Sequence, residues 1–247
     1  MSTIVFWHGW GMGPGVWNDL TAQLHPLLSS RYKLIVQPLP GYTPAQEPAV
    51  YYSADRMLDD LMAELDEPVT LCGWSLGAML AMLAAVRFPA RVDKLILISA
   101  TPNFMKRTDW PSGVALNMID KLGAGIRVDP ATALRRFITI VNQNDVNARE
   151  ITRKLSEVTS APIPVLESGL DLLKHTDFRP IVPDIRQPVL LLHGAHDTLM
   201  PSASAEWLRR HLPSARMAVL PGASHAPFLS DTEKCANLIA DFMHDRV

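Results

Sequence analysis

Residues 71–78 of this sequence read Leu-Cys-Gly-Trp-Ser-Leu-Gly-Ala, which places a serine between two glycines. An apolar, β-prone run from Pro68 to Cys72 leads into this motif, and Ala78 to Val86 have the composition of a helix. A strand, a Gly-x-Ser-x-Gly turn and a helix in this order form a nucleophile elbow. Glycines beside the serine let the helix pack closely against the strand. The stretch therefore predicts that Ser75 is a nucleophile at the tip of a tight turn.

Two further residues have the chemistry and the position that a serine nucleophile requires. A serine hydroxyl is a weak nucleophile, so it needs a base, and the base needs an orienting acid. Asp197 follows the strand-like run Val189–His193, and His225 follows the short apolar run Ala218–Leu220. The chain order serine, acid, histidine is the order found in nucleophile-elbow enzymes. We predict a catalytic triad of Ser75, Asp197 and His225.

A glycine-rich loop follows the first strand-like run, Thr3–Trp7. It reads His-Gly-Trp-Gly-Met-Gly over residues 8–13. In hydrolases of this type, one N–H of the oxyanion hole comes from such a loop, and the other comes from the residue after the nucleophile. Trp10 and Leu76 are therefore expected to supply these two backbone N–H groups. The alternative is an ordinary strand-to-helix turn that contains a buried Trp10.

Strand-like and helix-like segments alternate along most of the chain. This alternation predicts an α/β fold with a mostly parallel central sheet flanked by helices. Ligands bind beyond the carboxyl ends of the strands in such sheets, where the predicted site residues fall. Strands are expected at residues 3–7, 32–36, 68–72, 92–99, 189–193 and 218–220, and helices around residues 16–27, 57–65, 78–86, 203–211 and 232–244.

Between Pro102 and Pro188 the pattern changes to helices alone. Helical segments are expected at residues 114–122, 130–141, 145–158 and 163–174. A helical stretch of this length between two strands is too long for a simple connection and predicts a lid over the site. We expect residues 1–101 and 188–247 to form the core and residues 102–187 to form the helical lid.

The composition fits one such domain and excludes several other classes of protein. With 247 residues, of which 48% are hydrophobic, the chain can bury a full core. A net charge of −2 argues against nucleic-acid binding. The two cysteines, Cys72 and Cys235, suit a reducing compartment, and we see neither a leader peptide nor an apolar run of the roughly 18 residues that a membrane span needs. We expect a cytoplasmic monomer that needs no metal or cofactor.

The predicted lid carries an excess of positive charge. Between Lys121 and Lys154 the chain has seven basic and three acidic residues, although its total charge is −2. On a helix over residues 145–158, Arg149 and Arg153 project opposite the apolar face, as Arg136 does on the preceding helix. Like charges four residues apart are mildly destabilising, so an anionic partner would explain them. The alternative is an ordinary solvated helix face.

Motifs along nearly the whole chain resemble the α/β-hydrolase superfamily. More narrowly, they resemble the pimeloyl-acyl-carrier-protein methyl ester esterases of biotin synthesis. The matching stretches are His8–Gly11, Val16–Trp17, Leu39–Gly41, Gly73–Gly77, Arg136–Phe137, Arg149 with Arg153, Ala161–Pro164, Gly169–Leu173, Ala195–Pro201 and His225–Phe228.

The resemblance implies a carboxylesterase that acts on a pimeloyl methyl ester carried by acyl carrier protein, a strongly acidic partner. Guanidinium groups suit such a partner, because they pair with carboxylate and phosphate and steer the encounter. By this comparison the carrier-binding residues are Arg136, Arg149 and Arg153, with Arg135 as a further member. The residues implied to line the acyl channel are Trp10, Trp74, Leu76 and Phe137.

Three features depart from the family pattern. The β-hairpin that usually precedes the first strand is missing, so we expect a sheet that is shorter at one edge. Gln37 stands where the family usually has an aspartate, and Thr132 stands where a further lid arginine is expected. None of these departures touches the predicted triad.

Two other functions share much of this pattern. One is a serine hydrolase of free small esters, lactones or carbon–carbon bonds, which would use the same triad. The other is a hydrolase-like binding protein without catalysis, against which the intact serine, aspartate and histidine argue. The first differs from the carrier-dependent esterase mainly in the lid.

Overall fold

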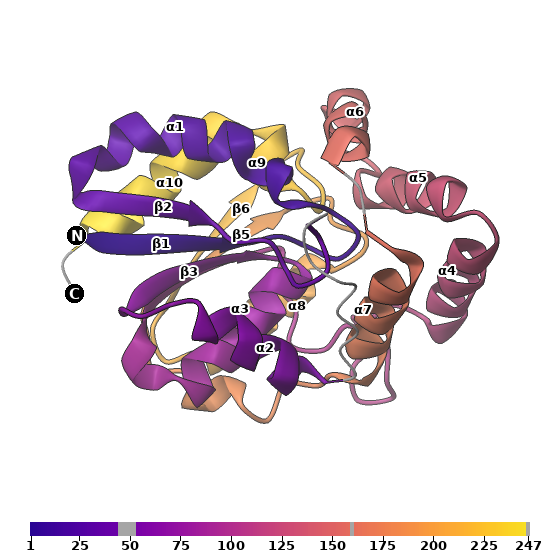
Figure 1. The fold of residues 1–247 in the computed structure, drawn as a ribbon, viewed down its shortest axis with the longest axis horizontal. Coiled ribbons are helices and arrows are strands. Elements are labelled where there is room, and N and C mark those ends of the chain that lie inside the picture. The colour runs from indigo at the N-terminus through magenta and orange to yellow at the C-terminus, as the bar shows by residue number, and fades with distance from the viewer. Residues whose placement is uncertain (44–52, 159–160, 246–247) are drawn as a thin grey trace.

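A sheet of six parallel strands forms the centre of the computed structural model, which describes residues 1–43, 53–158 and 161–245. The strands lie in the order β2-β1-β3-β4-β5-β6, with β2 and β6 at the edges (Figure 1). All five neighbouring pairs are parallel, as the alternation of strands and helices predicted. The strands are β1 (Ser2–Trp7), β2 (Tyr32–Val36), β3 (Val69–Trp74), β4 (Val92–Ile98), β5 (Val189–Gly194) and β6 (Ala215–Leu220).

Helices cover both faces of the sheet. Helices α1 (Asn18–Leu28) and α10 (Thr232–His244) lie together on one face, and α2 (Ala54–Ala63), α3 (Leu76–Arg87) and α8 (Ser202–His211) lie on the other (Figure 1). The short helix α9 (Pro227–Ser230) was not predicted. In α1 the buried face consists of Leu20, Leu24 and Leu28, whereas Leu27, the last residue of the predicted helix, is 38% exposed. After Leu24, the next buried residue is therefore four positions along the helix, at Leu28, and not three positions along, at Leu27.

The core is most complete around β3 and α3. Every residue of β3 is buried between β1 and β4. In α3, ten of twelve residues are buried, so this helix packs on all sides and shows no polar stripe. The strand and the helix are joined at Ser75, which therefore lies between two almost fully buried elements.

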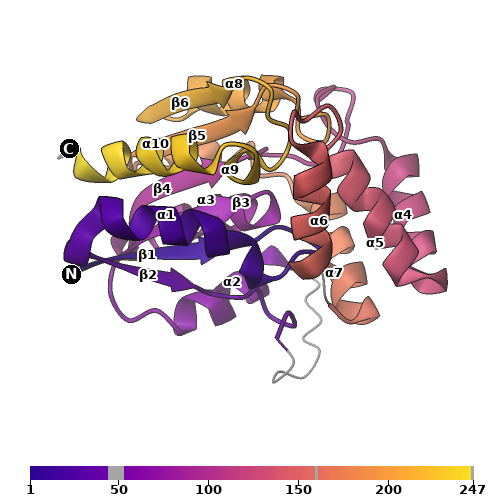
Figure 2. The same ribbon diagram turned by 90° about the horizontal axis from the view of Figure 1, so that it is seen from above.

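Four helices form an insert between β4 and β5, as the change of pattern predicted. They are α4 (Leu116–Val128), α5 (Pro130–Val141), α6 (Ala148–Val158) and α7 (Ile163–His175). The insert lies beyond the carboxyl ends of the strands (Figures 1 and 2). Helix α4 extends past the predicted end at Leu122, and α6 begins at Ala148 rather than at Asp145. None of the helices in the described ranges has the length and apolar character that a membrane crossing requires.

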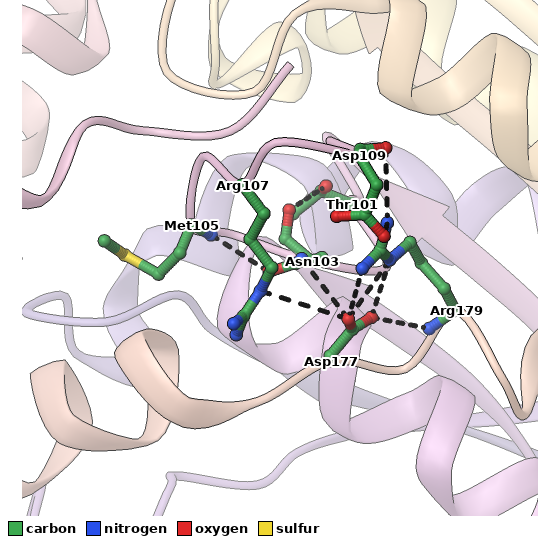
Figure 3. Close-up of polar contacts among 7 residues, drawn as sticks. All are labelled: Thr101, Asn103, Met105, Arg107, Asp109, Asp177 and Arg179. Atoms are coloured by element: carbon green, nitrogen blue, oxygen red, sulfur yellow. Dashed lines mark hydrogen bonds and ion pairs between the residues drawn. The ribbon is translucent and has the colours of Figure 1, made fainter. Parts of the chain in front are cut away.

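An ion-pair cluster ties the two ends of this insert together (Figure 3). The Arg179 guanidinium donates to both oxygens of Asp177, at 2.6 Å from Nη2 to Oδ2 and 2.9 Å from Nε to Oδ1. Its Nη1 lies 2.9 Å from Oδ2 of Asp109. Partial burial works against the charge of Asp177, but the hydrogen bonds from Arg179 prevail and lower the pKa of this carboxyl group. Since Asp109 follows β4 and Asp177 follows α7, the cluster closes the base of the insert.

Candidate active site

Ser75 lies in a strained turn between β3 and α3. Its backbone has a φ of 56° and a ψ of −116°, a conformation that residues with side chains rarely adopt. A Cβ atom on Gly77 would collide with the carbonyl oxygen of Trp7, and one on Gly73 would collide with the backbone of Gly77. Both glycines are therefore required for the helix to pack against the sheet. This is the nucleophile elbow that the motif predicted.

Asp197 lies in the loop after β5 and is almost fully buried. Its Oδ1 accepts hydrogen bonds from the backbone N–H groups of Leu199 at 3.0 Å and Met200 at 2.8 Å. Its Oδ2 lies 2.7 Å from Nδ1 of His225. Because a carboxylate only accepts, the shared hydrogen belongs to Nδ1 of the imidazole. The Nε2 atom of His225 is then the nitrogen that can accept a proton.

His225 follows β6 and is held from several sides. Its carbonyl oxygen accepts a hydrogen bond from the Trp74 indole Nε1 at 2.8 Å, and the two rings lie 5.6 Å apart. Because Trp74 directly precedes Ser75, the elbow itself holds the histidine loop. Among the described residues no hydrogen bond joins Ser75 Oγ to His225, and such catalytic bonds often tighten only when substrate is present.

The loop after β1 packs against the elbow. A Cβ atom on Gly9 would lie 3.2 Å from Cβ of Ser75, so the two segments are in contact. The Trp10 side chain is fixed by a 2.9 Å hydrogen bond from Nε1 to the Leu166 carbonyl and by an edge contact, at 5.0 Å, with the Phe137 ring. The backbone N–H groups of Trp10 and Leu76 donate no hydrogen bond to any described residue. Both groups, which we predicted for the oxyanion hole, are thus available to a ligand.

His8 is buried beside this loop, and its two ring nitrogens have different partners. Nδ1 donates to the Gly9 carbonyl at 2.9 Å, whereas Nε2 accepts from the backbone N–H of Leu39 at 3.0 Å. Only a neutral imidazole can do both. Burial, partly offset by the bond to Gly9, lowers the pKa of His8 to about 4.

This lowered pKa predicts a loss of stability in acid. Above the ordinary pKa of His8, about 6.5, its contribution to the free energy of unfolding is fully present, because the group is neutral folded and unfolded. As the pH falls toward 4, the unfolded chain gains a proton that the folded one rejects, which costs about 3 kcal/mol. Urea unfolding at about pH 7 and about pH 4.5 measures this loss. A His8→Asn variant should lose about 2 kcal/mol less between pH 7 and pH 4.5, and an equal loss in both proteins would contradict the assignment.

A second histidine, which the sequence analysis left out of the site, lies next to the acid. His193 Nε2 donates to the Met200 carbonyl at 2.6 Å and lies 3.5 Å from Oδ2 of Asp197. Burial lowers the pKa of His193 despite the nearby carboxylate. The strand–His-Gly pattern at residues 189–194 could have indicated this contact. No group of three metal-ligating side chains occurs among the described residues.

The predicted carrier-binding arginines lie on the outer surface of the insert, but their surroundings differ. Arg153 forms ion pairs with Glu150 at 2.7 Å and Glu157 at 2.6 Å on its own helix. Arg136 and Arg149 are exposed and pair with no described carboxylate, and Arg135 donates to Thr132 Oγ1 at 2.6 Å. Because Glu150, Arg153 and Glu157 are three and four residues apart on one helix, their spacing could have predicted the two ion pairs of Arg153.

Comparison with known sequences places the chain in a family. The profile of the alpha/beta hydrolase family matches residues 4–238. The chain is 39% identical over 249 residues to a pimeloyl-[acyl-carrier protein] methyl ester esterase of Aromatoleum aromaticum, with 96% of each chain covered. It is 35% identical over 235 residues to an esterase of the same name from Nitrosomonas europaea, covering 94% of this chain and 91% of that one.

Solved structures have the same fold at lower sequence identity. An esterase from Exiguobacterium antarcticum superposes with a TM-score of 0.90 at 24% identity, covering 99% of this chain and 92% of that one. An enol-lactonase from Burkholderia xenovorans superposes with a TM-score of 0.86 at 19% identity and the same coverage. The elbow, the parallel sheet and the family profile agree, and the chain belongs to the alpha/beta hydrolase family.

Proposed function

We propose that this chain is a carboxylesterase that hydrolyses the methyl ester of pimeloyl-acyl carrier protein in biotin biosynthesis. The observation that carries the proposal is the 2.7 Å hydrogen bond between His225 Nδ1 and Asp197, which leaves Nε2 as a base on a loop held by the Ser75 elbow. Relatives that cover more than nine-tenths of the chain bear this name. The presence of only two cysteines, both free, supports a cytoplasmic location.

The proposed reaction has two halves. In the first, His225 Nε2 takes the proton from Ser75 Oγ, which attacks the ester carbonyl carbon. The N–H groups of Trp10 and Leu76 stabilise the resulting oxyanion. The tetrahedral intermediate then expels methanol, which receives its proton from His225. In the second half, water loses a proton to His225 and attacks the acyl-enzyme, which releases the pimeloyl carboxylate and restores the serine.

Apolar side chains around the elbow suit the acyl chain. Trp10 and Phe137 are in edge contact, and Phe137 also lines a groove of about 480 Å³ between α4 and α5. Most of the groove is apolar, and Arg136 borders it. We assign Trp10, Trp74, Leu76 and Phe137 to the acyl channel and the helical insert to the lid that covers it. An apolar channel with a cationic border fits an acyl chain delivered by an acidic carrier.

The carrier is expected to dock on the outer surface of α5 and α6. Arg136 and Arg149 are exposed, and neither guanidinium group pairs with a described carboxylate. No such ion pair has to break when these two residues bind an anion. Arg153 can bind the carrier only if its ion pairs with Glu150 and Glu157 are replaced by ion pairs with acidic groups of the carrier. Ion pairs between fully exposed groups contribute little to stability because water solvates both partners, so the exchange loses little.

Charge reversal separates this function from that of a hydrolase of free small esters. The double variant Arg149→Glu, Arg153→Glu should lower kcat/KM for pimeloyl-carrier methyl ester about 10- to 100-fold, because steering and pairing both reverse. The same variant should hydrolyse nitrophenyl acetate at the wild-type rate. Methanol release and nitrophenol absorbance measure the two reactions.

The matched control places the same change of charge on the core. Arg209→Glu, Arg210→Glu on α8 alters two exposed residues outside the insert and should leave both reactions unchanged. An equal loss on both substrates in the Arg149, Arg153 variant would favour the small-ester hydrolase. A wild-type protein that hydrolyses neither ester and is not labelled at Ser75 by a fluorophosphonate would favour a binding protein.

A further inference from the structure

The connection between α5 and α6 lies against the loop that carries His225. The backbone N–H of His225 donates to the Val141 carbonyl at 3.2 Å, and the N–H of Val146 donates to the Gly222 carbonyl at 3.0 Å. Val141 and Val146 belong to the insert, whereas Gly222 and His225 belong to the core. The backbone of the proposed catalytic histidine is therefore held by a segment about 80 residues away in sequence.

Asp145 is the central residue of this connection. Its Oδ2 accepts a 2.7 Å hydrogen bond from the backbone N–H of Ser224, the residue before His225. Its Oδ1 accepts from the Ser230 hydroxyl at 2.9 Å and from the backbone N–H of Asn147 at 2.8 Å. The carboxylate is 8% exposed and pairs with no cation among the described residues. Three donors therefore compensate a buried charge, one on the residue before His225 and one at the end of α9.

Hydrogen bonds hold the backbone of His225 itself and the chain before and after it. Ser224 and Ser230 lie before and after it, and both bind the Asp145 carboxylate. The Trp74 indole holds its carbonyl oxygen, and the Val141 carbonyl holds its amide. Asp197 holds only the ring. Two carboxylates thus fix the histidine, one through the imidazole and the other through the main chain.

We propose that Asp145 is a positioning residue for His225, by which the helical insert sets the place of the catalytic base. The proposal rests on the proposed serine-esterase function, in which Nε2 must reach Ser75 Oγ. Without the Asp145 carboxylate, the N–H of Ser224 and the hydroxyl of Ser230 lose their acceptor, and only the backbone hydrogen bonds at Val141 and Val146 still join this part of the core to the insert. A displacement of about 1 Å at a catalytic group is enough to lower a rate on the order of 100-fold.

The test is the isosteric variant Asp145→Asn. An amide offers one oxygen, so an NH₂ group must face the N–H of Ser224 or the donors at Oδ1. We expect kcat for nitrophenyl butyrate, per active site titrated with a fluorophosphonate, to fall about 10- to 100-fold while KM stays within about twofold. In proton NMR, the downfield Nδ1–H signal of His225 should broaden or shift. Ser230→Ala, which removes only one donor, should lower kcat about threefold.

The matched control is Asp177→Asn, since Asp177 is also a hydrogen-bonded carboxylate that anchors the insert but does not contact the histidine loop. Its kcat should stay within about threefold of wild type, whatever its melting temperature. The proposal is overturned if Asp145→Asn and Asp177→Asn have the same kcat, or if Ser230→Ala and Asp145→Asn both keep the wild-type NMR signal. A wild-type protein without esterase activity would instead overturn the proposed function.

Discussion

Replacing Ser75 with alanine is expected to lower kcat for pimeloyl-carrier methyl ester by a factor on the order of 10⁶. The hydroxyl is the atom that forms the acyl-enzyme, so no other described group at the elbow can take its place. The strained backbone at residue 75 remains possible for alanine, which has no larger side chain than serine. Folding should therefore be kept while methanol release is lost.

The matched control for this variant is Ser204→Ala in α8. Ser204 is fully buried, and its hydroxyl has no hydrogen-bond partner among the described residues. Its removal should change neither the rate of methanol release nor the melting temperature. If Ser75→Ala retained more than about one-hundredth of the wild-type kcat, the acyl-enzyme mechanism would be wrong.

Replacing Asp197 with asparagine should lower kcat by about 10⁴, because it selects the wrong tautomer of His225. The backbone N–H groups of Leu199 and Met200 require an acceptor at the Oδ1 position, so they fix the amide oxygen there. The NH₂ group of the amide then faces Nδ1 of His225 and donates to it. The imidazole hydrogen must move to Nε2, which can then no longer accept the proton of the serine hydroxyl.

Asp231→Asn provides the control for exchanging an aspartate for an asparagine outside the site, at an exposed helix cap. The Asp231 carboxylate caps α10 by accepting the backbone N–H of Lys234 at 3.0 Å, and asparagine caps helices about as well as aspartate does. This variant should keep the wild-type kcat. A loss of less than about tenfold in Asp197→Asn would show that the tautomer is not set by this carboxylate.

The helical insert contributes to the site in three ways. Leu166 holds the Trp10 indole, Phe137 packs against that ring, and Val141 accepts from the amide of His225. A Cβ atom on Gly169 would also lie 2.5 Å from Cδ1 of Trp10, so this part of α7 needs a glycine. The insert is therefore a part of the site's framework as well as its cover.

Local sequence was sufficient to predict those elements whose motif or apolar periodicity lies within a few neighbouring residues. The boundaries of α5 and α10 were predicted to the residue, because Pro130 and Thr232 follow capping aspartates and the apolar spacing continues from there. The elbow was predicted because a strand-like run, the Gly-x-Ser-x-Gly motif and a helix-like run follow one another directly around Ser75. At the end of α1, in contrast, spacings of three and four residues both fit a helix, and only the structure shows that Leu28 is buried and Leu27 exposed.

By itself, then, the sequence determined the parallel α/β fold, the helical insert and the candidates for nucleophile, acid and base, since these depend on short motifs and their order. Only the tertiary structure decided what holds them: the acceptors and donors around Asp197, the Trp74 contact to His225, and the link from Asp145 to the histidine loop. It also decided that Arg149 faces no described carboxylate. The physical reason is that a hydrogen bond depends on distances of a few tenths of an ångström between segments far apart in the chain, and no local pattern encodes such distances.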